Sequence, residues 1–190
     1  MLTQMVALCP DRPKGIRDRS VLLLGFCSAM RRSEIAGLNI EDLRLEDEGI
    51  VITLPRSKTD QEGQGQTIYI PRGKRPETCP VIATTNWLKL RDAKAGPLYV
   101  RVRNGGALGT DHLTPGVIDV IVKTYASQVD ALNAYSAHSL RSGLATAAAR
   151  GGADDRTVMR QTRHTSVESV MGYIRQGTGF KDNVMQFLDL

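Results

Sequence analysis

The sequence predicts a mainly α-helical fold with one small antiparallel β-hairpin or sheet, in the α+β class. Two patterns carry this prediction: apolar residues recur at helical spacing along most of the chain, and β-branched residues gather in two short runs. The chain has 190 residues, of which 41% are hydrophobic, so it can bury one sizeable core. No linker separates the periodic segments, and we therefore expect one domain followed by a short tail.

The first part of the chain is predicted to be helical up to residue 37. Residues 2–8 favour a short helix, which Pro10 ends. Residues 16–29 are apolar nearly all round, which is typical of a helix at the centre of a core. Residues 33–36 favour a third, short helix, and Gly37 can end it.

Two arginines stand directly before this short helix. Arg31 and Arg32 could together bind a phosphate group, because a guanidinium offers a planar pair of donors to its oxygens. The alternative is that one of them simply pairs with Glu34 at the surface.

A β-hairpin is predicted next. Residues 50–54 and 67–70 are rich in β-branched side chains and are bounded by proline or glycine, as strands are. The polar, glycine-containing connection over residues 55–65 carries Lys58, which could reach over a ligand from this loop. A solvated lysine is the ordinary alternative at such a position.

The middle of the chain is interpreted as scaffold. Residues 80–94 have the pattern of a helix with a basic outer face, and residues 98–102 favour an extended segment. The basic, glycine-bearing run over residues 101–109 lacks the ending of a phosphate-binding loop, so we assign it no nucleotide. Thr114 can cap a helix that continues to about residue 128.

A helix near residue 140 carries the first candidate site. Ser136 is predicted to be its N-cap and Gly151 to end it, with an apolar stripe made of Leu140, Leu144, Ala147 and Ala148. His138 and Arg141 are three residues apart in the first turn, on the opposite face, where backbone donors favour an anion. The pair could bind a phosphate or could be two ordinary surface residues.

The last predicted helix carries a tyrosine on its flank. Residues 154–161 favour a short helix, and the next one has an apolar stripe of Val167, Val170, Met171 and Ile174. At about 100° per residue, Tyr173 lies roughly 120° from the centre of that stripe, on its flank. By itself this is usually a packing tyrosine. The alternative is a nucleophile that follows His164 by nine residues.

Composition limits the partners and cofactors. The net charge of +5 favours a polyanionic partner. The three cysteines are widely spaced and odd in number, which predicts reduced thiols rather than disulfides or a zinc site. The three histidines stand 26 residues apart in turn and have no i, i+4 partners, so we expect no metal and no other cofactor. Without an apolar run of membrane-spanning length or a signal peptide, we expect a cytoplasmic protein with no membrane contact.

Taken together, these residues resemble the catalytic domain of the tyrosine recombinase, or phage integrase, family. Its first arginine box resembles residues 31–35, its hairpin lysine Lys58, and its His-x-Leu-Arg box residues 138–141. Its final histidine and the tyrosine nine residues later match His164 and Tyr173. The resemblance runs from about residue 16 to residue 173. It implies six catalytic residues: Arg31, Lys58, His138, Arg141, His164 and Tyr173.

The sequence departs from the family pattern at two positions. Arg163 stands where the family commonly has glycine, and Ser142 stands where a histidine is common. Neither change removes a reactive group. Arg163 nevertheless replaces the residue that favours the tight turn before His164, and it adds a cation that could contact DNA.

The resemblance implies a metal-independent DNA strand transferase encoded by a bacterium, phage or mobile element. We expect double-stranded DNA as partner and a homo-oligomer, a tetramer on synapsed DNA, with a monomer allowed in its absence. Residues 1–178 would form the catalytic domain, and residues 179–190 a tail helix that docks in trans or folds back. The family's N-terminal DNA-binding domain is expected to be absent. A type IB topoisomerase-like enzyme and an inactive DNA-binding module are the alternatives.

Overall fold

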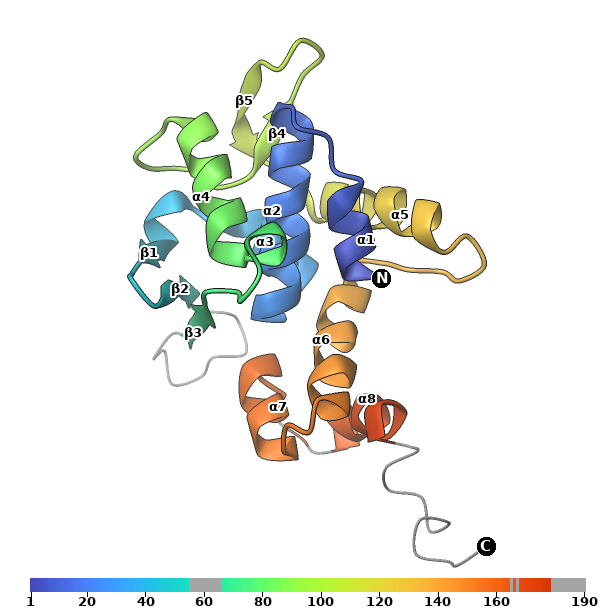
Figure 1. Ribbon diagram of the computed structural model, residues 1–190. Helices are drawn as coiled ribbons and strands as arrows, with labels where there is room; N and C mark the ends of the chain where they lie inside the picture. Colours follow the sequence, from blue (N-terminus) through green and yellow to red (C-terminus); the bar gives the residue numbers. More distant parts are fainter. Residues whose placement is uncertain (55–65, 165, 167, 179–190) are drawn as a thin grey trace, which may run out of the picture.

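The computed structural model describes residues 1–54, 66–164, 166 and 168–178. Helices dominate it, and two small antiparallel sheets lie at its edges (Figure 1), which confirms the predicted α+β class. The helices are α1 (Leu2–Ala7), α2 (Pro13–Ser28), α3 (Arg32–Gly37), α4 (Pro80–Arg91), α5 (Pro115–Val129), α6 (His138–Arg150), α7 (Asp155–Thr162) and α8 (Glu168–Thr178). Within these ranges, no helix is long and apolar enough to cross a lipid bilayer.

The first sheet contains the predicted hairpin and one further strand. Strands β2 (Gly49–Leu54) and β3 (Gln66–Pro71) pair antiparallel, with Ile50 opposite Ile70 and Ile52 opposite Ile68. Strand β1 (Leu43–Leu45) adds to the other edge of β2. The sequence analysis missed β1 because three residues are too few for an alternation of apolar and polar side chains to indicate a strand, and most of β1 is exposed.

The second sheet was predicted only in part. Strand β4 (Val100–Val102) lies within the predicted extended segment, and β5 (Leu108–His112) returns antiparallel to it. The interpretation of the glycine-bearing run over residues 101–109 as a loop is wrong at residues 108–109, which lie in β5, whereas residues 101–102 lie in β4, within the segment predicted to be extended. Strand β5 has one apolar side chain, Leu108, and its last three residues are polar and exposed, so neither its composition nor its period indicates a strand.

Helix α2 is the centre of the main core, as its sequence predicts. Leu22 and Leu24 are fully buried on it, and α4 and α6 pack against it. A second, smaller cluster holds α6, α7 and α8 together through Ala145, Ala149, Val158, Val170 and Ile174. These three helices gather at one end of the molecule, away from the β4–β5 hairpin (Figure 1).

The start and the buried face of α6 differ from the prediction. The N-cap is Ala137, not Ser136, and the Ser136 N–H instead donates to Ser139 Oγ at 3.0 Å. Ala147 is exposed, whereas Arg141 is buried with 3% of its surface accessible. The apolar stripe was ambiguous because α6 consists largely of alanine and other small residues, and Ala145 and Ala149 are the ones that contact α7 and α8.

Candidate active site

Tyr173 is placed beside His138 by the packing of α8 against α6. Val170 and Ile174 are buried in the smaller cluster, and Tyr173 lies half-buried on the flank of that stripe, as its spacing predicts. Val167 and Thr165 lie outside the described residues. The Tyr173 hydroxyl is 2.9 Å from Nε2 of His138, and the ring centroids are 6.2 Å apart. The two residues, 35 positions apart in sequence, are therefore within hydrogen-bond distance.

Arg141 reaches from α6 to the end of the central helix. Ala29 adopts a left-handed conformation with φ of 50° and ends α2, and its carbonyl accepts a hydrogen bond of 2.7 Å from Arg141 Nη1. Burial, together with the charges of Arg163 and Arg31, lowers the pKa of Arg141 to about 10. The side chain thus remains a cation at neutral pH and is held in one orientation.

Arg31 is the more exposed arginine of the site. Its Nη1 donates to Glu34 Oε1 at 2.8 Å, so the surface pair weighed from the sequence is present, and 57% of its side chain is exposed. Its backbone N–H also donates to the other Glu34 oxygen at 2.8 Å. A pocket of about 440 Å³ is lined by Arg31, Arg32, His138 and Arg141, together with Met30, Ser33, Asp119 and Ser136. The arginines and the histidine predicted to bind a phosphate thus line one pocket.

His164 completes the group on the other side of the tyrosine. Its Nδ1 is 2.7 Å from Thr162 Oγ1, and its ring centroid is 6.3 Å from that of Tyr173. Arg163, directly before it, has φ of 56° and ends α7, and the His164 N–H donates to the Met159 carbonyl at 3.2 Å. The tight turn that the family makes with glycine is therefore kept here by an arginine in the left-handed region.

We expect His164 to titrate below the ordinary histidine pKa of 6.5. Burial lowers its pKa first, and the charges of Arg141 and Arg31 and the nearby His138 lower it further. Since the unfolded chain binds this proton more readily, protonation of His164 should reduce the stability of the fold as the pH falls below 6.5. An NMR titration of the His164 ring checks the direction, and Arg31→Ala should move the pKa back up. A pKa above 6.5 would contradict this electrostatic description.

The comparisons with known proteins show the family of the chain. A family model described as the phage integrase family matches residues 1–178. The chain belongs to the phage integrase family. An integrase/recombinase xerD homolog of Selenomonas ruminantium is 38% identical over 176 residues, covering 92% of this chain and 52% of that protein. Tyrosine recombinase XerD of Neisseria meningitidis serogroup B is 30% identical over 167 residues, covering 86% of this chain and 52% of that protein.

Solved structures of recombinases share the fold of this phage integrase family member. A crystal structure of XerA recombinase superposes with a TM-score of 0.75 at 18% identity, over all of this chain and 62% of that chain. XerH site-specific recombinase, in a post-cleavage complex, superposes with a TM-score of 0.71 at 17% identity, over 98% of this chain and 48% of that chain. The chain thus spans about half the length of the curated relatives it matches.

The structure brings together five of the six residues predicted from the family pattern: Arg31, His138, Arg141, His164 and Tyr173. Lys58 lies outside the described residues, in the connection between β2 and β3. The sequence analysis noticed Arg163 as an added cation that could contact DNA. In the structure its guanidinium donates to Glu34 at 2.7 Å and is largely buried.

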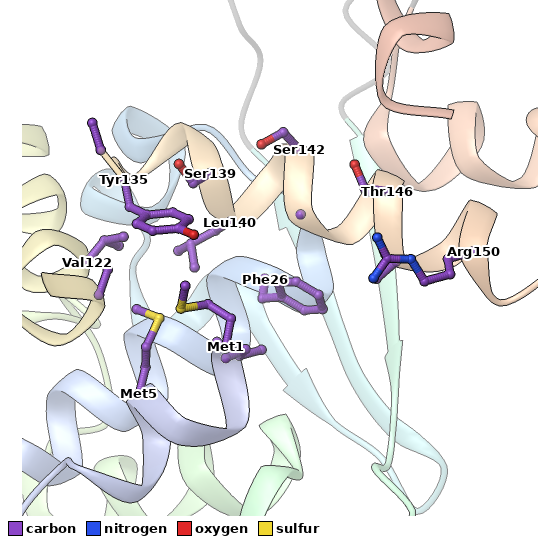
Figure 2. Close-up of a pocket in the computed structure, with 15 residues that line it drawn as sticks. Met1, Met5, Phe26, Val122, Tyr135, Ser139, Leu140, Ser142, Thr146 and Arg150 are labelled. Carbon is purple, nitrogen blue, oxygen red and sulfur yellow. The ribbon is translucent and has the colours of Figure 1, made fainter. Parts of the chain in front are cut away.

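A second pocket of about 670 Å³ lies elsewhere on α6, between α1, α2 and α5 (Figure 2). Met1, Met5 and Phe26 line it together with Leu140, and its surface is mainly apolar. None of the five reactive side chains above lines this pocket. The candidate site on the Tyr173 side is therefore separate from the pocket in Figure 2.

Proposed function

We propose that the chain is the catalytic part of a site-specific DNA recombinase that cleaves and rejoins strands through a covalent 3′-phosphotyrosyl intermediate at Tyr173. The contact of 2.9 Å between the Tyr173 hydroxyl and His138 Nε2 carries the proposal. The contact supports the proposal because Nε2 of His138, in the tautomer that carries its proton on Nδ1, can accept the proton of the phenol, and a protonated phenol is a weak nucleophile.

Each cleavage step balances as a transesterification. The Tyr173 oxygen attacks phosphorus, its proton passes to Nε2 of a neutral His138, and the bond from phosphorus to the 5′-oxygen breaks. Lys58 supplies a proton to that oxygen, which leaves as a 5′-hydroxyl. Rejoining runs in reverse, with His138 returning its proton to the tyrosine. The phosphodiester bond energy is kept, so no nucleotide cofactor takes part.

Cationic side chains stabilise the charge that develops on the phosphate. Arg31 and Arg141 line one pocket with His138, and each can give two donors to non-bridging oxygens. Because Arg141 is buried and tied to Ala29, its orientation is set before DNA arrives. His164, kept neutral by its lowered pKa, would donate one hydrogen bond to the phosphate.

Double-stranded DNA is the proposed substrate. The net charge of +5 suits a polyanion, and the XerH and λ integrase structures of the same fold are DNA complexes. We further propose a homo-oligomer on synapsed DNA, in which residues 179–190 dock on a neighbouring protomer. We also propose residues 1–178 as the catalytic domain.

The decisive experiment uses a pool of nicked duplexes with a randomised central sequence, in which a short fragment diffuses away after cleavage. Wild-type protein should retain DNA covalently after denaturation, and sequencing the retained DNA gives the target site. Relaxation of supercoiled DNA without recombinants would favour a topoisomerase IB-like enzyme. Tight binding with no adduct would favour an inactive binding module and would sink the proposal.

A sulfur-substituted substrate tests the role of Lys58. We expect Lys58→Ala to cleave ordinary DNA about 10²- to 10⁴-fold more slowly, which is the usual size of a general-acid contribution. With sulfur at the 5′-bridging position, the leaving thiolate needs no proton, so the variant should recover most of the wild-type single-turnover rate. Failure of this rescue would exclude Lys58 as the acid.

A further inference from the structure

Arg163 holds a backbone conformation that favours glycine. With φ of 56° and ψ of 42° it ends α7 in the left-handed region, where a Cβ atom crowds the following carbonyl. The next residue is His164, so any change of this turn moves a member of the site. An arginine at this point costs free energy relative to glycine, which contacts of its side chain have to offset.

The side chain of Arg163 is the inner partner of Glu34. Its Nη2 donates to Glu34 Oε2 at 2.7 Å, and only 9% of the side chain is exposed. The other partner of this carboxylate, Arg31, is 57% exposed. The two arginines therefore share one carboxylate, with Arg163 on the buried side and Arg31 on the side of the pocket that also contains His138 and Arg141.

The charges around Glu34 do not cancel. Arg31, Arg141 and Arg163 contribute three positive charges against one carboxylate, which leaves a net charge of about +2. Among the described residues, Nε and Nη1 of Arg163 are buried and have no hydrogen-bond partner. Arg163 also acts on Arg141, whose pKa is lowered first by burial and next by the charge of Arg163. The excess charge is thus concentrated where the phosphate is expected.

We propose that Arg163 is a positioning residue, which keeps the Glu34 carboxylate neutralised while Arg31 moves from Glu34 to the scissile phosphate. With Arg31 as its only ion-pair partner, Glu34, whose side chain is 18% exposed, would keep the hydrogen bond from the Arg31 backbone N–H but would have no cation beside it while the phosphate arrives. With Arg163 in place, the carboxylate stays paired during this exchange. The inference rests on the proposed function, since it assigns Arg163 to the same reaction.

This role predicts a larger effect on rate than on DNA binding. A phosphodiester carries one negative charge, and the pentacoordinate transition state formed by an attacking phenolate carries two. Removing Arg163 lowers the net charge of the cluster from about +2 to about +1. A cluster of about +1 balances the single negative charge of the bound phosphodiester, but it no longer balances the two negative charges of the transition state. The loss should therefore be seen in the cleavage step at saturating DNA.

The test compares single-turnover cleavage by Arg163→Gly, Arg163→Met and Arg163→Lys on the retained DNA sequence. We expect Arg163→Gly and Arg163→Met to cleave about 10-fold more slowly, Arg163→Lys to stay within about threefold of wild type, and Kd to change less than threefold. Arg44→Ala is the matched control, because it removes an exposed arginine–glutamate pair on β1, away from the pocket that Arg31 and Arg141 line, and should cleave normally. A cooperative unfolding transition confirms that each variant folds. If Arg163→Gly does not fold, the cleavage rate of Arg163→Met tests the inference in its place.

A Glu34→Gln background separates positioning from a merely structural effect. Glutamine has no charge to neutralise, so adding Arg163→Gly or Arg163→Met there should slow cleavage no more than about twofold. The inference would be overturned, and the proposed function would stand, if Arg163→Gly and Arg163→Met cleaved at the wild-type rate. The same holds if they caused the same 10-fold loss in the Glu34→Gln background. If the wild-type protein forms no adduct, the proposed function fails, and the inference fails with it.

Discussion

Replacing Tyr173 with phenylalanine is expected to abolish the covalent protein–DNA adduct and leave the domain folded. The substitution removes a single oxygen, the one that lies 2.9 Å from His138 Nε2. The ring stays, and it packs on the same cluster as Val170 and Ile174, so thermal stability should change little. Cleavage should fall by at least about 10³-fold, because loss of a nucleophile removes the covalent step itself.

Denaturing gel electrophoresis with labelled DNA measures this loss, and DNA binding by the same variant shows that the site is still occupied. Tyr69→Phe is the matched control: Tyr69 lies on β3, is 66% exposed and also loses a single hydroxyl. It should form the adduct at the wild-type rate. An undiminished adduct in Tyr173→Phe would mean that another side chain attacks the DNA.

Arg141→Ala is expected to impair both chemistry and folding. Removing the buried guanidinium takes a charged donor from the phosphate, which typically costs about 10²- to 10³-fold in rate. It also leaves the Ala29 carbonyl, at the end of α2, without the donor that now lies 2.7 Å from it. An unsatisfied buried acceptor costs about 1–3 kcal/mol, so the free energy of unfolding should fall by that amount.

Urea unfolding and single-turnover cleavage separate the two effects of this substitution. Arg141→Lys keeps a charge but not the planar fork, and we expect its cleavage rate to lie between wild type and Arg141→Ala. Arg103→Ala, at an exposed position between β4 and β5, should change the free energy of unfolding by less than about 0.5 kcal/mol. If cleavage per folded Arg141→Ala molecule equals that of wild type, the arginine serves the fold alone.

The sequence predicted the elements whose periodicity is strong. The central position of α2, the β2–β3 pairing and the flank position of Tyr173 all follow from apolar spacing, and the structure has them. Strands β1 and β5 could not be predicted, because their residues are exposed and their pairing is decided by the neighbouring strand. The prediction of Ser136 as the N-cap was wrong. The side chain of Ser139 accepts a hydrogen bond from the backbone N–H of Ser136, whereas the prediction had the side chain of Ser136 accept from the helix.

The candidate site was predictable as a set of residue types, and not as a set of contacts. A short motif places Arg31 next to Glu34, since three residues bring them onto one helical turn. Nothing in the local pattern indicates that Arg163 joins the same carboxylate from 129 positions away. Nor does helical spacing show that Arg141 is buried, because the face that α6 buries is decided by α2, α7 and α8.

The division of the interior into two clusters separates the stability of the domain from that of its reactive helix. Within the described residues, α8 is held chiefly by a few small side chains of α6 and α7, whereas α2 lies within the much larger main cluster. Opening of such a peripheral unit requires less free energy than global unfolding. The melting temperature of the whole domain therefore reports on the main cluster around α2. The local stability of α8, which carries Tyr173, is measured by amide hydrogen exchange along that helix.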